Sequence, residues 1–229
     1  MRTQLVVAMA MMVTACATAP AAVVLGPDAT EGLIVMEVVN EGPIAKTTYQ
    51  IEAAAYDPTQ SRIESSGYFL LYANNSPGQP ASRYLVARAK PGTYALTAVS
   101  HKSTWYDCFN NGTVSFRIEP GVVTFLGKLD ARPALADIAL KLPSYSTNSE
   151  KFYVLDTPRP ALTQPTDLAD WNIPLSAYLG TTFPQVTAPV RPVETRPATF
   201  ASGRSLLGQK VCYGYFNRAK DDPKTPPEK

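Results

Sequence analysis

Residues 30–142 alternate between short apolar runs and turns rich in glycine and proline. The clearest run is Thr113 to Glu119, in which Val114, Phe116 and Ile118 share one face. Period-two patterning of this kind predicts a strand with one buried face. Strand character is also present in residues 32–40, 46–55, 67–73, 82–90, 93–100 and 122–129. Together these runs predict a mainly β fold, a seven-stranded antiparallel sandwich whose outer faces meet water.

Two proline-glycine pairs punctuate these strands, Pro91-Gly92 and Pro120-Gly121. Proline followed by glycine suits the central positions of a type II turn, whose second central residue needs a positive φ. The sequence therefore predicts a hairpin turn at each pair.

The segments around these pairs carry a resemblance. Lys90 to Leu96 reads KPGTYAL, and Arg117 to Gly127 reads RIEPGVVTFLG. The block from about residue 30 to 140 resembles a loose group of uncharacterised Gram-negative envelope lipoproteins with a prealbumin-like or immunoglobulin-like β-sandwich. Because the shared motifs are turn and core patterns, the resemblance implies a fold and an envelope location, and it carries over no functional residue.

Residues 143–229 differ in composition, since they hold 12 of the 21 prolines. Proline has no N–H to donate to a ladder, so this region predicts a mostly irregular C-terminal extension that packs partly on the sandwich. Thr166 to Asn172 suits one helical turn capped by Thr166 or Asp167. The other expectations are a strand at residues 151–156, an extended stretch at 181–199, a last strand at 206–216 and a disordered tail from about 221.

The first sixteen residues carry an export signal. Arg2 precedes a short apolar run from Leu5 to Val13, and Val13-Thr14-Ala15-Cys16 follows. This box resembles the bacterial lipoprotein signal, in which the cysteine thiol receives a diacylglycerol. We therefore expect a signal peptide over residues 1–15, lipidation (palmitate) at Cys16 and a tether over residues 16–29. The alternative is ordinary cleavage near Ala15, Ala17 or Ala19.

Location and partners follow from the same segment and from the charge. Ala17 rather than aspartate follows the cysteine, which by resemblance to lipoprotein sorting favours the bacterial outer membrane, on either its periplasmic or its surface face. The chain carries 21 basic and 19 acidic residues, so no electrostatic footprint for nucleic acid is present. The expected partners are the membrane, through the lipid, and an envelope protein or polysaccharide.

Two cysteines remain once Cys16 is lipidated, Cys108 and Cys212. An even pair in an oxidising compartment predicts a disulfide. The alternative is two buried thiols. Two lone cysteines and one histidine lack metal-ligand spacing, so we expect neither a metal nor a cofactor.

Candidate chemistry is confined to one polar loop, which contains His101, Trp105, Tyr106 and Phe109. Exposed aromatic side chains suit a binding loop, while the alternative is that they cap the core. We therefore expect a non-enzymatic structural or binding role, with no catalytic residue. The alternatives are an envelope hydrolase centred on His101 and a soluble secreted carbohydrate-binding module.

Overall fold

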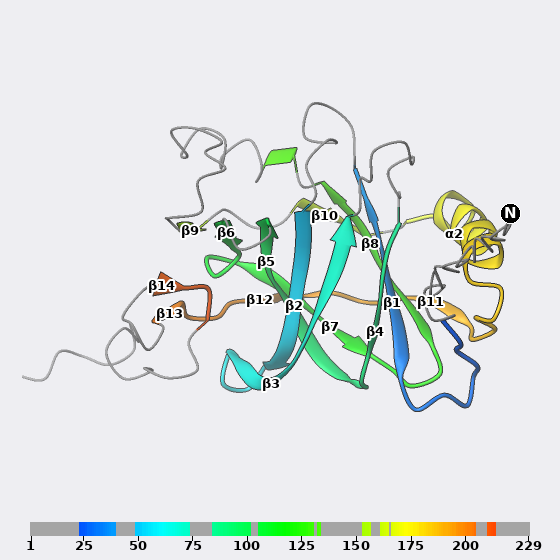
Figure 1. Cartoon of the computed structure of the whole chain (residues 1–229), viewed down its shortest axis with the longest axis horizontal. Helices are drawn as coiled ribbons and strands as arrows, with labels where there is room; N and C mark the ends of the chain where they lie inside the picture. Colours follow the sequence, from blue (N-terminus) through cyan, green and yellow to red (C-terminus); the bar gives the residue numbers. More distant parts are fainter. Residues whose placement is uncertain are drawn as a thin grey trace, which may run out of the picture.

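The structure is a computed structural model of the chain, and it describes residues 23–39, 49–73, 84–101, 105–130, 132–133, 153–156, 161–164, 166–204 and 210–213. Cys16, the expected signal peptide and the expected tail lie outside these residues. The described part is mainly β and contains two curled sheets that pack against each other (Figure 1). Among the described residues, no helix is long and apolar enough to cross a bilayer.

The first sheet is built around β1 (Gly32–Val38), which lies between β4 (Tyr84–Ala89) and β8 (Val123–Asp130). The other edge of β8 is shared by two short strands, β10 (Ala161–Thr163) and β11 (Val190–Pro192). β1 runs antiparallel to β4 and parallel to β8. The first sheet is therefore mixed.

The second sheet runs from β3 (Arg62–Ala73) through β2 (Tyr49–Asp57) to β5 (Gly92–His101). The far edge of β5 is shared by β7 (Thr113–Ile118) and β6 (Trp105–Cys108). Two strands from the C-terminal third extend it: β12 (Arg196–Ala198) pairs with β7, and β9 (Tyr153–Asp156) pairs with β6. A separate two-stranded ribbon contains β13 (Gly203–Arg204) and β14 (Lys210–Val211).

Strands form in all seven regions in which they were predicted, but the predicted architecture is wrong in two respects. The pairs β1–β8, β6–β9 and β11–β8 are parallel, so the sandwich is not purely antiparallel. The described residues of the C-terminal extension are more regular than predicted, since they supply strands to both sheets and one helix. Its proline-containing strands, β11 and β12, lie at sheet edges, where a missing N–H breaks no ladder.

The core between the sheets is made by the inward faces of both. The predicted buried face of β7 is confirmed, since Phe116 and Ile118 are buried and Val114 packs against them. Buried side chains from the other strands complete this core: Ile34, Met36, Val38, Ile51, Ala53, Leu71, Leu85, Ala89, Tyr94, Leu96, Val99, Leu126 and Leu129. Burial of this apolar surface is the main force holding the two sheets together.

The outer faces of the sheets meet water less than predicted, because part of each is covered, although Arg88, Lys128 and Arg117 remain exposed. Every residue of β1 is buried, which requires neighbours on both sides of the first sheet. Helix α2 (Leu168–Thr182) covers the outer face of that sheet (Figure 1). Strands β13 and β14 lie on the side of the molecule away from α2 (Figure 1), and Cys212 and Tyr213, which follow β14, pack on the second sheet. The arrangement has four layers.

Helix α2 is longer than the single turn expected. Asp167, one of the two residues predicted as the N-cap, accepts a hydrogen bond from the Ala169 N–H at 2.8 Å. Trp171, Leu175 and Leu179 recur at four-residue spacing and are buried against the sheet. Pro174 lies inside the helix and costs one backbone hydrogen bond there.

Both proline-glycine pairs join strands that belong to different sheets, so neither closes a hairpin. Pro91-Gly92 leads from β4 to β5, and Pro120-Gly121 leads from β7 to β8. Gly121 has a φ of +63°, as a type II turn requires, whereas no positive φ occurs at Gly92. At that corner the Tyr94 hydroxyl donates to the Lys90 carbonyl at 2.9 Å, which explains the tyrosine in the KPGTYAL motif.

Candidate functional site

The outer face of the second sheet carries the most unusual polar arrangement among the described residues. We call residues 196–204 and 210–213 the C-terminal clasp. Its strand β12 lies at the edge of the sheet, and its Phe200, Cys212 and Tyr213 pack on this face. Small side chains line much of the face beneath the clasp, and Ala54, Ala95 and Ala98 are all completely buried; Tyr56 and Ile63 complete it. Phe200 and Tyr213 of the clasp pack on it, with their rings edge to face and 6.3 Å between centroids. Small residues on the sheet thus make room for aromatic residues of the clasp.

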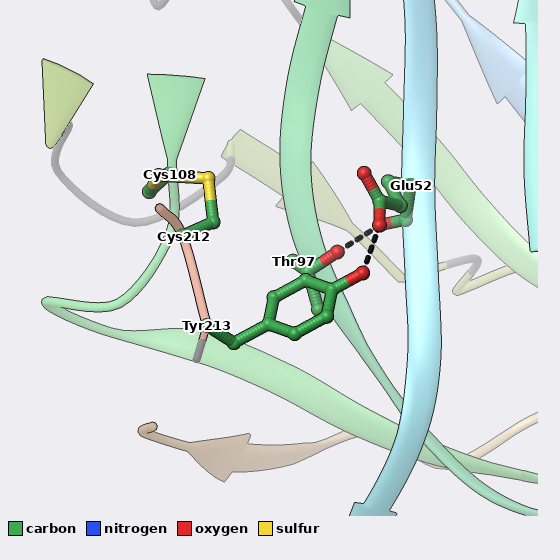
Figure 2. Close-up of a disulfide and its surroundings, with 5 residues drawn as sticks. All are labelled: Glu52, Thr97, Cys108, Cys212 and Tyr213. Carbon is green, nitrogen blue, oxygen red and sulfur yellow. Dashed lines mark hydrogen bonds between the residues drawn. A yellow bond between two sulfur atoms is a disulfide. The ribbon is translucent and has the colours of Figure 1, made fainter. Parts of the chain in front are cut away.

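A cysteine pair joins the clasp to the sheet. Cys108 ends β6, opposite Ala98 of β5, and Cys212 follows β14. Their sulfur atoms lie 2.00 Å apart and their Cα atoms 5.3 Å apart, which is disulfide geometry (Figure 2). Both side chains are buried. The structure therefore brings together the two cysteines that the sequence pairs.

Glu52 is a buried carboxyl group beside this pair, on β2. Burial raises the pKa of Glu52 above its ordinary value of 4.5, and the hydrogen bond from Tyr213 lowers it in part. The Tyr213 hydroxyl donates to Oε1 of Glu52 (Figure 2). Because Tyr213 directly follows Cys212, the covalent link and the hydrogen bond fix the same short piece of chain.

A β-bulge positions Glu52. Ala53 pairs with Leu96 and Glu52 pairs with Ala98, so Thr97 is the extra residue on β5. The Thr97 hydroxyl donates to the main-chain carbonyl of Glu52 at 3.2 Å, and the Thr97 carbonyl accepts from the Phe109 N–H at 2.9 Å. At this bulge β5 changes its partner from β7 to β6. The bulge thus marks where the sheet divides.

The residues expected in a polar binding loop lie instead in and beside a β-hairpin. His101 at the end of β5 pairs with Trp105 at the start of β6, and Tyr106 pairs with Ser100. The prediction of one long polar loop is therefore wrong, because these residues form ladder pairs. Phe109 is 2% exposed and belongs to the core between the sheets, as the alternative interpretation had it.

Two potential nucleophiles of the described hairpin are engaged in other contacts. The Cys108 sulfur is bonded to Cys212, so it is no nucleophile in this state. Ser100 is buried, and its hydroxyl lies 3.5 Å from the side-chain oxygen of Gln50. Within the described ranges, no group of three or more histidine, cysteine, aspartate or glutamate side chains is placed to hold a metal ion.

A second candidate is a cavity of about 330 Å³ beside β7 and the chain joining β11 to β12. Its charged lining residues are Arg117, Glu194 and Arg196. The Ser115 hydroxyl, also in the lining, donates to the Arg196 carbonyl at 3.4 Å and so helps to hold β12 against β7. The cavity thus lies where the C-terminal chain packs beside β7, and the charges of its lining residues sum to a positive value.

Sequence reasoning missed Glu52, Thr97 and Tyr213. A signal for Glu52 exists, since it is the one charged residue in the apolar run from Ile51 to Tyr56. A carboxylate in such a run needs a hydrogen-bond donor when the run is buried. The donor comes from 161 residues away, and no local pattern identifies it.

Comparisons of the chain with protein families, curated proteins and solved structures found no match.

Proposed function

We propose that the protein is a lipid-anchored component of the bacterial outer membrane, with a non-enzymatic structural or binding role. The observation that carries the proposal is the approach of Cys108 and Cys212 to bonding distance. Disulfides persist in oxidising compartments such as the periplasm. A disulfide therefore agrees with the export that the expected signal peptide and Cys16 predict. It also pairs the two cysteines that remain when Cys16 is lipidated.

The buried polar groups support a structural or binding role. Glu52 accepts the Tyr213 hydroxyl, and Thr97 donates to the main chain of β2. Each of these side chains is thereby engaged in holding the clasp or the bulge in place. We assign the sandwich to the prealbumin-like or immunoglobulin-like group on the KPGTYAL and RIEPGVVTFLG segments, which form the two corners between the sheets.

Incorporation of radiolabelled palmitate tests the anchor. The full-length chain is expressed in a Gram-negative host as wild type, as Cys16→Ser, and as the double variant Cys108→Ala/Cys212→Ala. We expect label in the wild type and in the double variant, both in the outer-membrane fraction. Cys16→Ser is expected unlabelled and soluble. A Cys16→Ser protein that stays in the membrane pellet after a salt wash would place the anchor elsewhere.

A further inference from the structure

The N-terminal segment enters the fold at a definite place. Leu25 is completely buried and packs in the same apolar cluster as Trp171 and Leu175 of α2. Its N–H donates to the Gln185 carbonyl at 3.3 Å, and its carbonyl accepts from the Thr187 N–H at 2.8 Å. The folded domain is therefore fixed from this residue onward, beside α2 and the chain that follows it.

Only a short stretch separates this point from the proposed lipid. Val23, the first described residue, is seven residues after Cys16. At most about 3.3–3.6 Å per residue, that stretch spans no more than roughly 25 Å. A lipid on Cys16 would thus hold the side of the molecule that carries α2 near the bilayer, whatever path the tether takes.

Two exposed apolar side chains belong to the elements on this side. Of the described residues, Val24 at 56% and Ile173 at 69% are the exposed large hydrophobic ones. Val24 adjoins Leu25, and Ile173 lies on α2, the outermost layer on this side (Figure 1). Asp170 is the only charged residue within α2, so few charges would lose water when this surface meets a lipid headgroup layer.

We propose that Val24 and the outer face of α2 form a membrane-facing surface that rests on phospholipid when Cys16 carries its lipid. The inference rests on the proposed function, since the lipid supplies the proximity. The C-terminal clasp, two sheets away from α2, then faces the aqueous side of the envelope.

Site-specific fluorescence in vesicles tests this orientation. Ile173→Cys and, as a matched control in the clasp, Ala201→Cys are made in the full-length lipidated protein, since both positions are exposed. The new thiol is labelled with a polarity-sensitive fluorophore, and thermal melts check that each labelled protein is folded. The proteins are reconstituted through their lipid into protein-free vesicles of phosphatidylethanolamine and phosphatidylglycerol, with and without spin-labelled lipid.

We expect spin-labelled lipid to cause a loss of fluorescence at position 173 and no loss at position 201. A protein that floats with the vesicles yet shows no loss at 173, or an equal loss at both positions, would overturn the inference and leave the anchor intact. Docking of an envelope protein on α2 instead would also leave 173 unquenched. An unlabelled wild-type protein that fails to float with vesicles would overturn both the anchor and the orientation.

Discussion

The two sheets are covered on their outer faces by different physical means. Helix α2 covers the first sheet through large side chains: Trp171 stacks on Phe125 with 5.0 Å between ring centroids, and Tyr178 packs on Tyr84 at 4.9 Å. The clasp covers part of the second sheet, and a cysteine pair and hydrogen bonds from Tyr213 to Glu52 and from Tyr56 to the Thr199 carbonyl hold it there. The first cover is held by packing and the second by specific bonds.

The difference follows from how each cover is built. A helix satisfies its own backbone hydrogen bonds, so burial of one apolar stripe is enough to dock it. The described clasp has only β12 paired with a sheet, three residues long with Pro197 at its centre. A segment with so few ladder bonds gains little from backbone pairing, and a covalent link offsets the entropy of ordering it.

The largest effect is expected from the packed cover. Trp171→Ala removes a ring that is 5% exposed and stacked on Phe125, so we expect the free energy of unfolding to fall by about 3–5 kcal/mol. Trp171→Phe keeps an aromatic face and is the control with the smaller loss. Urea unfolding followed by far-UV circular dichroism measures both. Equal midpoints for Trp171→Ala and wild type would mean that α2 does not depend on this contact.

Removal of the covalent link is expected to cost somewhat less. Cys108→Ala/Cys212→Ala opens a link between residues separated by 104 positions, and a typical loss is about 2–4 kcal/mol. The wild type should lose the same amount in reductant, whereas the double variant should not respond to it. Thermal melts in both conditions provide the measurement. A double variant as stable as the oxidised wild type would show that the covalent link does not stabilise the fold.

The two proline-glycine corners give a third, smaller contrast. A Cβ at Gly121 would lie 1.9 Å from the Pro27 carbonyl oxygen, and φ there is +63°, whereas a Cβ at Gly92 would meet only the Tyr94 ring at 3.5 Å. We expect Gly121→Ala to cost at least about 2 kcal/mol, since a positive φ alone costs about 1–2 kcal/mol and the clash with the Pro27 carbonyl adds to it. Gly92→Ala should stay within about 1 kcal/mol of wild type. Paired thermal melts that showed equal losses would contradict the separate roles.

Glu52 gives the smallest effect and one that depends on pH. Because burial raises its pKa above 4.5, the folded protein keeps this proton at pH values at which the unfolded chain has lost it. Its contribution to stability is therefore full below pH 4.5 and is lost as the pH rises through the raised pKa. Glu52→Gln should lack that loss, so its stability relative to wild type should increase across this window.

Urea unfolding at several pH values measures the Glu52 effect. Glu64→Gln, an exposed change on β3, is the control and should follow the wild type. If Glu52→Gln tracks the wild type at every pH, the carboxyl group does not titrate as its burial requires.

The strands were predictable because their signal is local. Alternation placed β7 and its buried face correctly, and composition and parity paired Cys108 with Cys212. The sheet to which each strand belongs was not predictable, because the strands on either side of Pro91-Gly92 and of Pro120-Gly121 look alike in a hairpin and in a corner between sheets.

The covers were the least predictable part. A helical apolar stripe is present in the sequence, made of Trp171, Leu175, Tyr178 and Leu179. Pro174 interrupts this pattern, and the apolar Ile173 lies among the polar residues of the opposite face. The sequence of the clasp gives a strand signal and a cysteine, but it does not show which face the clasp covers, since its contacts join residues far apart in the chain. Prolines that suggested irregular chain proved compatible with edge strands.

Amide hydrogen exchange before and after reduction tests the central claim most directly, that packing holds one cover and specific bonds hold the other. Reduction of the folded wild type should speed exchange in residues 196–204 and 210–213 while residues 168–182 of α2 stay protected. The double cysteine variant should show the faster clasp exchange without reductant. An unchanged clasp after reduction, or α2 losing protection together with it, would contradict the account.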